Sequence, residues 1–327
     1  MGGGDAVVVE GLVKRYGDTY ALKGLSFTVA RGEVYGLLGP NGAGKTTTLR
    51  AIAGALRPTR GRILVEGVDP AREPLRVKRL VGVVPELPSL FPELTVRDNL
   101  EFIAGIYGFS RSEARRRARE TAEALGLGDY LGVRYGRLSK GLKRRVDIAA
   151  ALIHDPPILL LDEPTSGLDV IAASRLRERI AALARQGKTV VLSSHYIEEV
   201  MALADRALIL YRGSKIVEGT PAMLRRVLSK KRVTIYYTGE PPQSLSVEAR
   251  EALGAYGVED LKIERGALSF KASRTVEALE ASIRLLRERG LRVVDVEVLP
   301  PSWDDVFKAH IEAAGGRAAC PCGGRAG

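Results

Sequence analysis

The chain has few cysteines and no long apolar run, and each shortage excludes a class of protein. Of its 327 residues only Cys320 and Cys322 are cysteines, and both lie in a glycine-rich C-terminal stretch. Two such residues cannot build the disulfide framework of a small secreted domain, so a reducing interior fits. No apolar run approaches the roughly 18 residues of a membrane span. The first residues also lack the basic and apolar regions of a signal peptide, so we expect neither feature.

The composition is that of a globular protein with a basic surface. Apolar residues make up 45% of the chain and charged residues 27%, which is enough for a core, and the length suggests two domains. The formal net charge of +11 would suit a nucleotide, an anionic lipid or a nucleic acid. Charge alone favours a solvated basic surface, and we do not expect a nucleic-acid partner.

A glycine-rich stretch at residues 39–47 is the most informative feature. It reads Gly-Pro-Asn-Gly-Ala-Gly-Lys-Thr-Thr and fits the pattern G-x-x-x-x-G-K-[ST]. Residues 34–38 before it read as a strand, and 48–56 after it as a helix, which is the context of a phosphate cradle. Lys45 would bridge the β- and γ-phosphates, and the Thr46 hydroxyl would hold Mg²⁺. The predicted nucleotide-binding residues are Gly39, Pro40, Asn41, Gly42, Ala43, Gly44, Lys45, Thr46 and Thr47.

Acidic and histidine side chains follow two later apolar runs. Residues 158–161 read as a strand buried on both faces, and Asp162 and Glu163 follow it; His195 follows a second strand at 189–192. Open α/β sheets bind ligands at the carboxyl ends of their strands. Asp162 therefore suits Mg²⁺ coordination and Glu163 the orientation of an attacking water. His195 could contact the γ-phosphate, although a single histidine is more often structural.

The order of the elements predicts an α/β fold followed by a second domain. Strands alternate with helices around a parallel sheet, and the segment from 95 to 154 is mainly helical. From about residue 232 the pattern restarts as β-α-β-β-α-β, a ferredoxin-like order for a small α+β domain. We predict a P-loop NTPase core at 1–228 with a helical subdomain at about 87–155, an accessory α+β domain at 232–312 and a disordered tail at 313–327.

Two local patterns carry narrower predictions. Ser110-Arg111-Ser112-Glu113 predicts a capping box, in which Ser110 accepts from the backbone of Glu113 and the Glu113 side chain reaches back. Tyr16 ends a predicted strand at 6–16. Its ring could stack on a nucleotide base or be an ordinary cross-strand aromatic, and the residues alone leave both interpretations open.

Taken in order, the motifs resemble those of the ATP-binding subunits of ABC transporters over about residues 6–225. Residues 39–46 match the Walker A loop, and 158–162 with Glu163 look like Walker B and its catalytic glutamate. The resemblance implies ATP and Mg²⁺ as cofactors and an ATP-hydrolysing enzyme. In that family Asp162 and Thr46 would hold the metal.

Three further matches concern the surroundings of the nucleotide. Residues 166–169 resemble the D-loop, which ends here at Asp169, and His195 matches the switch histidine. Tyr16 matches the aromatic residue that stacks on adenine. The resemblance therefore implies binding roles for Tyr16 and Asp169 and a catalytic role for His195 beside Glu163.

Two motifs depart from the family pattern. The signature Leu-Ser-Gly-Gly-Gln is here Leu-Ser-Lys-Gly-Leu, so Ser139 and Gly141 remain to face a γ-phosphate. Lys140 either adds a cation near that anion or points to solvent. Glu86 occupies the position of the Q-loop glutamine, and its carboxylate could still ligate Mg²⁺ or water.

The Ser-Lys-Gly signature, the Pro85-Glu86 pair and the C-terminal extension at 301–307 resemble one branch, the ATPase subunits of ABC-2-type exporters. The resemblance implies a homodimer, or a pair with another ABC ATPase, that encloses two ATP molecules. Its closure would drive a separate membrane-spanning permease from the cytoplasmic, inner face of the cell membrane.

Two alternatives remain at this point. A non-transport ABC ATPase could act on ribosomes or nucleic acid, although such members resemble paired cores or carry a long coiled coil, and this chain has one Walker A and no heptad array. A P-loop module that only holds nucleotide would not need Glu163 and His195 at strand ends.

Overall fold

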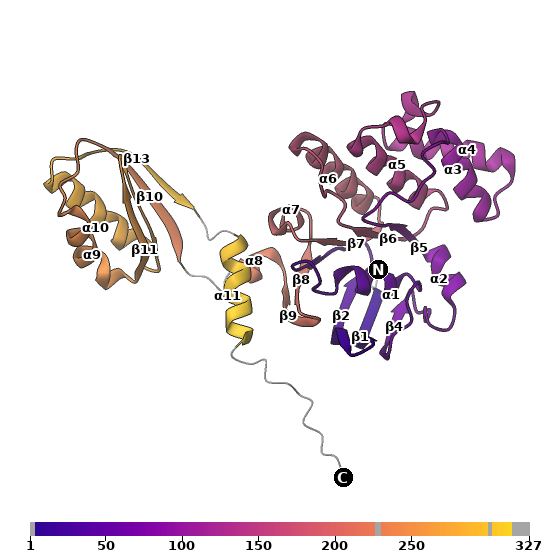
Figure 1. The fold of residues 1–327 in the computed structure, drawn as a ribbon, viewed down its shortest axis with the longest axis horizontal. Helices are drawn as coiled ribbons and strands as arrows, with labels where there is room; N and C mark the ends of the chain where they lie inside the picture. Colours follow the sequence, from indigo (N-terminus) through magenta and orange to yellow (C-terminus); the bar gives the residue numbers. More distant parts are fainter. Residues whose placement is uncertain (1–3, 226–229, 300–302, 316–327) are drawn as a thin grey trace, which may run out of the picture. The chain divides into compact units, whose positions relative to one another are not determined.

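The computed structural model describes residues 4–225, 230–299 and 303–315 and divides into two units, residues 1–221 and 222–327 (Figure 1). The first unit contains a six-stranded sheet, a three-stranded sheet and a group of helices, and the second contains a four-stranded sheet. The division lies ahead of residue 228, where the sequence predicts the end of the first domain.

The six-stranded sheet brings the ends of several strands to one edge. Its order is β5-β6-β7-β3-β8-β9, and all neighbours are parallel except β8 and β9. The central strands are buried along their whole length, as expected where elements cover both faces. The strands are β3 (Val34–Leu38), β5 (Val81–Val84), β6 (Ile158–Asp162), β7 (Thr189–Ser194), β8 (Arg206–Tyr211) and β9 (Ser214–Gly219).

An antiparallel sheet and one helix form the layer below. The strand order of this sheet is β2-β1-β4, with β1 at Asp5–Tyr16, β2 at Thr19–Ala30 and β4 at Arg60–Val65. Helix α1 (Lys45–Ile52) lies between the two sheets (Figure 1), and apolar side chains from both sheets and α1 form one core. The helix begins at Lys45 and not at residue 48, so the lysine and threonine of the loop form its first turn.

Helices cover the other face of the large sheet (Figure 1). Helices α5 (Lys140–Leu152), α6 (Val170–Arg185) and α7 (Ile197–Met201) pack on this face, and α3 (Val96–Ile106) and α4 (Arg111–Ala124) pack against α5. Helix α2 (Pro74–Leu80) lies on the side of α1, where its Val77 joins the core between the two sheets. The predicted capping box of α4 is half formed. Ser110 accepts from the Glu113 N–H at 3.4 Å, but the Glu113 carboxylate pairs with Arg116 and Arg117 at 2.6 and 2.7 Å. Bonds between charged groups are stronger than the bond to a neutral N–H that they replace.

A stacked pair of rings joins the helical segment to the sheet. Tyr107 follows α3 and His154 follows α5, and their ring centroids lie 3.8 Å apart with an interplanar angle of 8°. His154 Nε2 donates to the Val81 carbonyl at 3.2 Å, and the buried Nδ1 has no hydrogen-bond partner in the described structure. Burial lowers the pKa of His154 to about 4, so the ring is neutral at pH 7.

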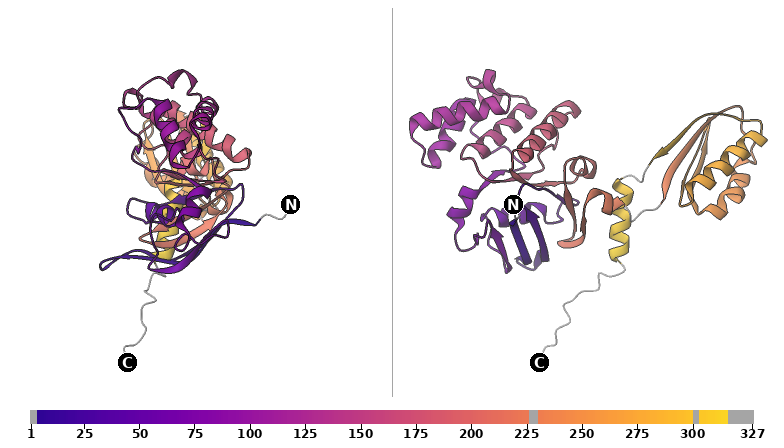
Figure 2. Two further views of the ribbon diagram at one scale, coloured as in Figure 1. Left: turned by 90° about the vertical axis from the view of Figure 1, so that its right-hand side faces the viewer. Right: turned by 180° about the vertical axis from the view of Figure 1, so that it is seen from behind.

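The second unit is an antiparallel sheet covered by two helices (Figure 1 and Figure 2). The sheet order is β11-β12-β10-β13 and the elements run β-α-β-β-α-β, a ferredoxin-like arrangement. The elements are β10 (Lys231–Thr238), α9 (Leu245–Leu253), β11 (Val258–Glu264), β12 (Ala267–Ala272), α10 (Thr275–Glu288) and β13 (Arg292–Leu299). The core between the sheet and the helices includes Val233, Ile235 and Phe270 from the strands and Leu286 from α10.

A last helix, α11 (Trp303–Gly315), contacts the short α8 (Pro221–Arg225), since His310 Nε2 donates to the Leu224 carbonyl at 3.0 Å. Residues 313–315, predicted as the start of a disordered tail, are helical, and 316–327 lie outside the described residues. In the described part of the chain no helix has both the length and the apolar composition to cross a bilayer.

The half-buried His154 predicts a loss of stability in acid. Its pKa is about 4 when folded and about 6.5 when unfolded, so between these values only the unfolded chain takes up the proton. The free energy of unfolding should therefore fall as the pH drops from about 6.5 to about 4, by about 1–2 kcal/mol for a half-buried ring. His154→Phe, which keeps an aromatic ring for stacking, should flatten this dependence in urea unfolding at pH 4.5, 5.5 and 7.

Asp147 supplies the control because it titrates in the opposite sense. Burial raises its pKa to about 6, so the folded chain binds this proton more tightly and gains stability as the pH falls. Asp147→Asn should therefore steepen the loss in acid. An unchanged slope in His154→Phe would contradict the assignment to His154.

Candidate active site

The loop at 39–47 runs from β3 into α1 and depends on glycine at two places. A Cβ added to Gly39 would lie 2.2 Å from the Leu210 carbonyl oxygen, and one added to Gly44 would lie 2.7 Å from Leu22 Cδ2. Gly44 also has a φ of 109°, a conformation that other residues rarely adopt. The loop therefore packs closely against neighbouring parts of the first unit. The free N–H groups at the start of α1 face the loop.

Lys45 is fixed across this loop. Its side chain is only 6% exposed, and Nζ donates to the carbonyl oxygens of Gly39 at 2.7 Å and Pro40 at 3.3 Å. The same nitrogen lies 3.2 Å from Glu163 Oε1. The predicted loop lysine and the predicted catalytic carboxylate are thus in direct contact, although they lie far apart in the chain.

Asp162 is held by two hydroxyl groups. Thr46 Oγ1 donates to Asp162 Oδ1 at 3.2 Å, and Ser193 Oγ donates to the same oxygen at 2.5 Å. Ser193 Oγ also accepts from the Glu163 N–H at 3.2 Å. Sequence reasoning missed Ser193. The feature that could have identified Ser193 is the parallel register of β6 and β7, which pairs Asp162 with Ser193.

These oxygens fit a magnesium site that is completed by other ligands. Hydroxyl and carboxylate oxygens are donors that Mg²⁺ prefers, and Thr46 and Asp162 already meet at one point. In residues 4–225, 230–299 and 303–315 there is no group of three or more His, Cys, Asp or Glu that could hold a metal alone. Mg²⁺ is usually bound through one or two carboxylates together with water and substrate phosphates, which suits this sparse set.

Glu163 lies between a lysine and a histidine. His195 Nδ1 donates to Glu163 Oε2 at 2.9 Å, and the His195 backbone N–H donates to the same oxygen at 3.3 Å. Glu163 has a φ of 46°, which is uncommon for a residue with a side chain and typical of constrained functional sites. The carboxylate is 6% exposed, and Oε1 has no hydrogen-bond partner within the described residues. The contact of that oxygen is the ion pair with Lys45 Nζ at 3.2 Å.

Arg144 connects three segments around this carboxylate and was not predicted. It is 6% exposed, and its guanidinium donates to the carbonyl oxygens of Pro85, Asp162 and Pro164, the last at 3.0 Å. Burial lowers the pKa of Arg144, an effect opposed by nearby acidic groups, including Glu86. The charged run around Arg144 in the sequence reads as a solvated helix, so no local signal indicated a buried anchor.

The signature and D-loop residues lie at the starts of two neighbouring helices. Ser139 caps α5 by accepting from the Leu142 N–H at 3.3 Å, and Asp169 caps α6 by accepting from the Ala172 N–H at 2.8 Å. A Cβ on Gly141 would lie 3.0 Å from Ala172 Cβ, so the two helix starts are in contact. Among the described residues no hydrogen bond or ion pair joins Ser139 or Asp169 to Lys45, Asp162, Glu163 or His195.

Lys140 lies against the D-loop of its own chain. A Cβ added to Gly167 would come within 2.1 Å of Lys140 Nζ. The end of the side chain therefore lies over Gly167 while the residue stays exposed, and both expectations for Lys140 remain predictions. The nearby Glu86 is exposed and follows Pro85, whose carbonyl Arg144 holds.

Tyr16 stands apart from these groups. It ends β1, is 50% exposed, and has Lys14 Nζ 4.9 Å from its ring centroid. The ring can accept a stacked group on its free surface, so its predicted contact with adenine stays a prediction.

Comparison with known proteins identifies the family. The family model described as ABC transporter matches residues 22–166. A daunorubicin resistance ATP-binding protein of Streptomyces coeruleorubidus is 37% identical over 311 residues, which cover 92% of this chain and 94% of that protein. The chain belongs to the ATP-binding proteins of ABC transporters. A Nod factor export ATP-binding protein of Burkholderia orbicola is 44% identical over 179 residues, 55% of this chain and 59% of the relative.

Solved structures of this family agree with the fold of the ABC ATPase. One ATP-binding subunit of an ABC transporter is 34% identical with a TM-score of 0.61, covering 68% of this chain and 92% of its own. A dimeric ATP-binding cassette in a post-hydrolysis state with ADP and Pi is 29% identical with a TM-score of 0.61, covering 66% and 98%. The predicted α/β P-loop fold is confirmed, and the chain is an ATP-binding and ATP-hydrolysing enzyme.

Substitution of Arg144 tests whether this residue stabilises the fold around the active site. Arg144→Gln removes a charged donor from two buried carbonyl groups and one partly buried carbonyl group, so the free energy of unfolding should fall by about 2–4 kcal/mol. Urea unfolding measures this. The control is Arg137→Gln at an exposed position just before α5, which should change stability by less than about 0.5 kcal/mol. Equal effects of the two substitutions would show that Arg144 is not an anchor.

Proposed function

We propose that this ABC ATPase is the ATP-hydrolysing subunit of an ABC-2-type exporter. The observation that carries the proposal is the position of the Glu163 carboxylate, in contact with Lys45 and His195 and adjacent to the Asp162–Thr46 pair. The names of the relatives, which concern daunorubicin resistance and Nod factor export, support the exporter assignment.

In this proposal the loop 39–47 holds the phosphates of ATP. Most of its residues offer backbone N–H groups to the phosphates, namely Gly39, Asn41, Gly42, Ala43, Gly44 and Thr47. Pro40 has no N–H and contributes only to the shape of the loop. Lys45 turns its ammonium from the loop carbonyls to the β- and γ-phosphates. Thr46 and Asp162 would hold Mg²⁺, with Glu86 as a further oxygen ligand. The bound metal supplies charge neutralisation at the phosphates.

Glu163 and His195 act on the attacking water. Once Lys45 has turned to the phosphates, Glu163 Oε1 accepts a proton from the water, while His195 holds Oε2 and keeps the carboxylate oriented. His195 is 33% exposed and could also contact the γ-phosphate, as the switch histidine of the family would. Ser193 positions Asp162 and the Glu163 backbone, so it acts through them.

Ser139 and Gly141 complete the site of a second chain. They lie at the N-terminus of α5, where free N–H groups and a hydroxyl suit an anion. Because neither is joined to the Lys45–Glu163 group of its own chain by a described bond, we assign them, with Asp169, to ATP bound by a partner. The dimeric cassette among the similar structures supports this homodimer. Tyr16 would stack on adenine.

The permease contact is assigned to the surface from 86 to 95 and the neighbouring α3. Leu87, Phe91, Phe102 and Ile106 are exposed there, and the rings of Phe91 and Phe102 meet edge to face at 5.2 Å. Exposed apolar groups of this kind fit a protein partner. The ABC ATPase would then be peripheral on the cytoplasmic, inner face of the cell membrane. No observation favours the ribosome or nucleic-acid alternative.

Glu163→Gln tests the catalytic assignment. The amide keeps the shape of the side chain but cannot act as a base, so ATP hydrolysis should fall by about 10²–10⁴-fold while ATP still binds. Size-exclusion chromatography with ATP should show a trapped dimer. Glu198→Gln, an exposed glutamate in the first turn of α7, is the matched control and should hydrolyse ATP at the normal rate. Normal hydrolysis by Glu163→Gln would refute the assignment.

Glu86→Gln tests the departure in the Q-loop. The amide oxygen can still serve as a ligand, and Glu86 is exposed, so ATP binding should persist and turnover should change by less than about tenfold, a barrier change under about 1.4 kcal/mol. Nucleotide binding and steady-state hydrolysis at saturating ATP measure the two effects. Complete loss of hydrolysis would mean that the carboxylate itself is required.

A further inference from the structure

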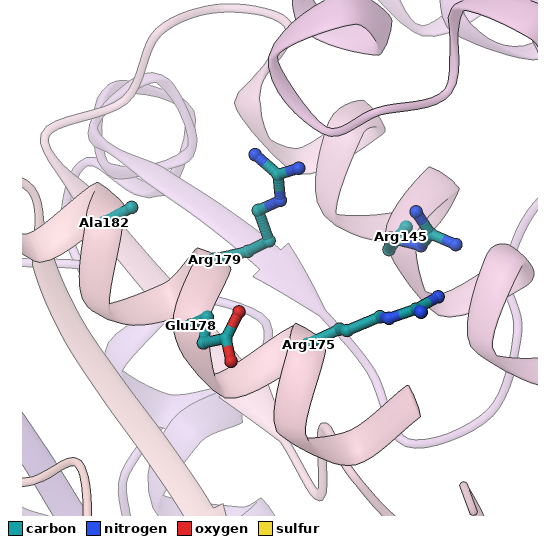
Figure 3. A pocket seen from close by; sticks show the side chains of 5 residues that line it. All are labelled: Arg145, Arg175, Glu178, Arg179 and Ala182. Atoms are coloured by element: carbon teal, nitrogen blue, oxygen red, sulfur yellow. The ribbon is translucent and has the colours of Figure 1, made fainter. Parts of the chain in front are cut away.

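An open surface cavity lies between α5 and α6 and includes none of the residues assigned to the nucleotide; Arg175, Glu178 and Arg179 in it are exposed. Its volume is about 340 Å³, and it is lined by Arg145, Arg175, Glu178, Arg179 and Ala182 (Figure 3). A cavity of this size is much larger than the space that a single water molecule needs, so it has room for a phosphate group.

Two helices bring the arginines together. Arg175 and Arg179 are four residues apart on α6 and share one face, and Arg145 reaches the cavity from α5 (Figure 3). A Cβ added to Gly126 would lie 3.5 Å from Arg179 Nη2 and 3.7 Å from Arg145 Nη1, so these two guanidinium groups converge on one turn. Arg179 Nη1 donates to the Ala124 carbonyl at 3.3 Å, which holds its guanidinium in place and leaves its other donors for a ligand.

The cavity keeps an uncompensated positive charge. Three arginines face one glutamate, and in the described part of the chain no carboxylate oxygen lies within 4.0 Å of a nitrogen of Arg145, Arg175 or Arg179. Burial lowers the pKa of Arg145, and repulsion from Arg175 and Arg179 adds to this effect. The chain neutralises other helix arginines: Arg116 on α4 pairs with two glutamates.

We propose that this cavity is a binding site for a phosphate-bearing anion. Guanidinium groups present paired N–H donors that match phosphate oxygens, and such bonds between charged groups are strong. An anion here would remove the repulsion among the arginines. A concave site with three converging arginines suits a compact phosphate group better than an extended acidic peptide, whose carboxylates would have to bend into it.

Two sources carry this chemistry, a free phosphorylated molecule and the headgroup of an anionic lipid. Inorganic pyrophosphate serves as the probe for the first source. Vesicles of phosphatidylglycerol serve for the second, with phosphatidylcholine vesicles as the neutral comparison. Both probes are applied to the full chain carrying Lys45→Ala, because this substitution weakens phosphate binding at the loop 39–47.

The decisive comparison adds Arg175→Gln with Arg179→Gln to that chain, and separately Arg185→Gln. Arg185 is exposed on the same helix and does not line the cavity. Isothermal titration should show saturable pyrophosphate binding that weakens at least about tenfold in the double substitution and is unchanged in Arg185→Gln. If the protein does not bind pyrophosphate but sediments with phosphatidylglycerol vesicles, and the double substitution abolishes that sedimentation, the ligand is a lipid headgroup.

The melting temperature measured without ligand shows whether each variant is still folded. Arg175→Gln removes a repelling charge, so its melting temperature should be equal or higher while the rise produced by pyrophosphate disappears. A lower melting temperature with the pyrophosphate effect retained would give Arg175 a structural role and overturn the proposal. Binding of neither probe, equal binding by all variants, or binding of poly-glutamate but not of phosphate would also overturn it.

Discussion

The active site depends on the burial of two adjacent carboxylates at the end of one strand. Burying a charge is costly unless partners compensate, and each carboxylate has its own set. Asp162 accepts from the hydroxyls of Thr46 and Ser193, whereas Glu163 meets Lys45 on one side and His195 on the other. These partners come from the phosphate loop and from β7, so the parallel order of the sheet is a requirement of the chemistry.

A second constraint ties this site to the helices. Arg144 is a buried cation whose described bonds go to backbone carbonyls, at Pro85 before Glu86 and at Asp162 and Pro164 on either side of Glu163. The signature helix α5 is therefore attached both to the segment assigned to the permease and to the catalytic strand. Under the proposed function, a movement of α5 relative to the sheet would change these bonds directly and would couple ATP hydrolysis to the permease.

Interactions between charges also explain where local rules fail. The capping box of α4 is incomplete because two arginines attract the Glu113 carboxylate, and the exposed Lys140 lies over Gly167 of the next motif. The cavity on α6 shows the opposite case, in which basic residues gather without acidic partners. A basic run in a sequence has the same appearance in all three situations, because the partner is chosen by neighbouring elements.

The sequence by itself determined the P-loop, the strand-end positions of Asp162, Glu163 and His195, and the β-α-β-β-α-β order of the second unit, since motifs and apolar periodicity are local. Only the tertiary structure decided that Ser193 supports Asp162, that Arg144 is buried, and that Arg145 meets Arg175. These contacts join residues far apart in the chain, and strand register and helix packing bring them together.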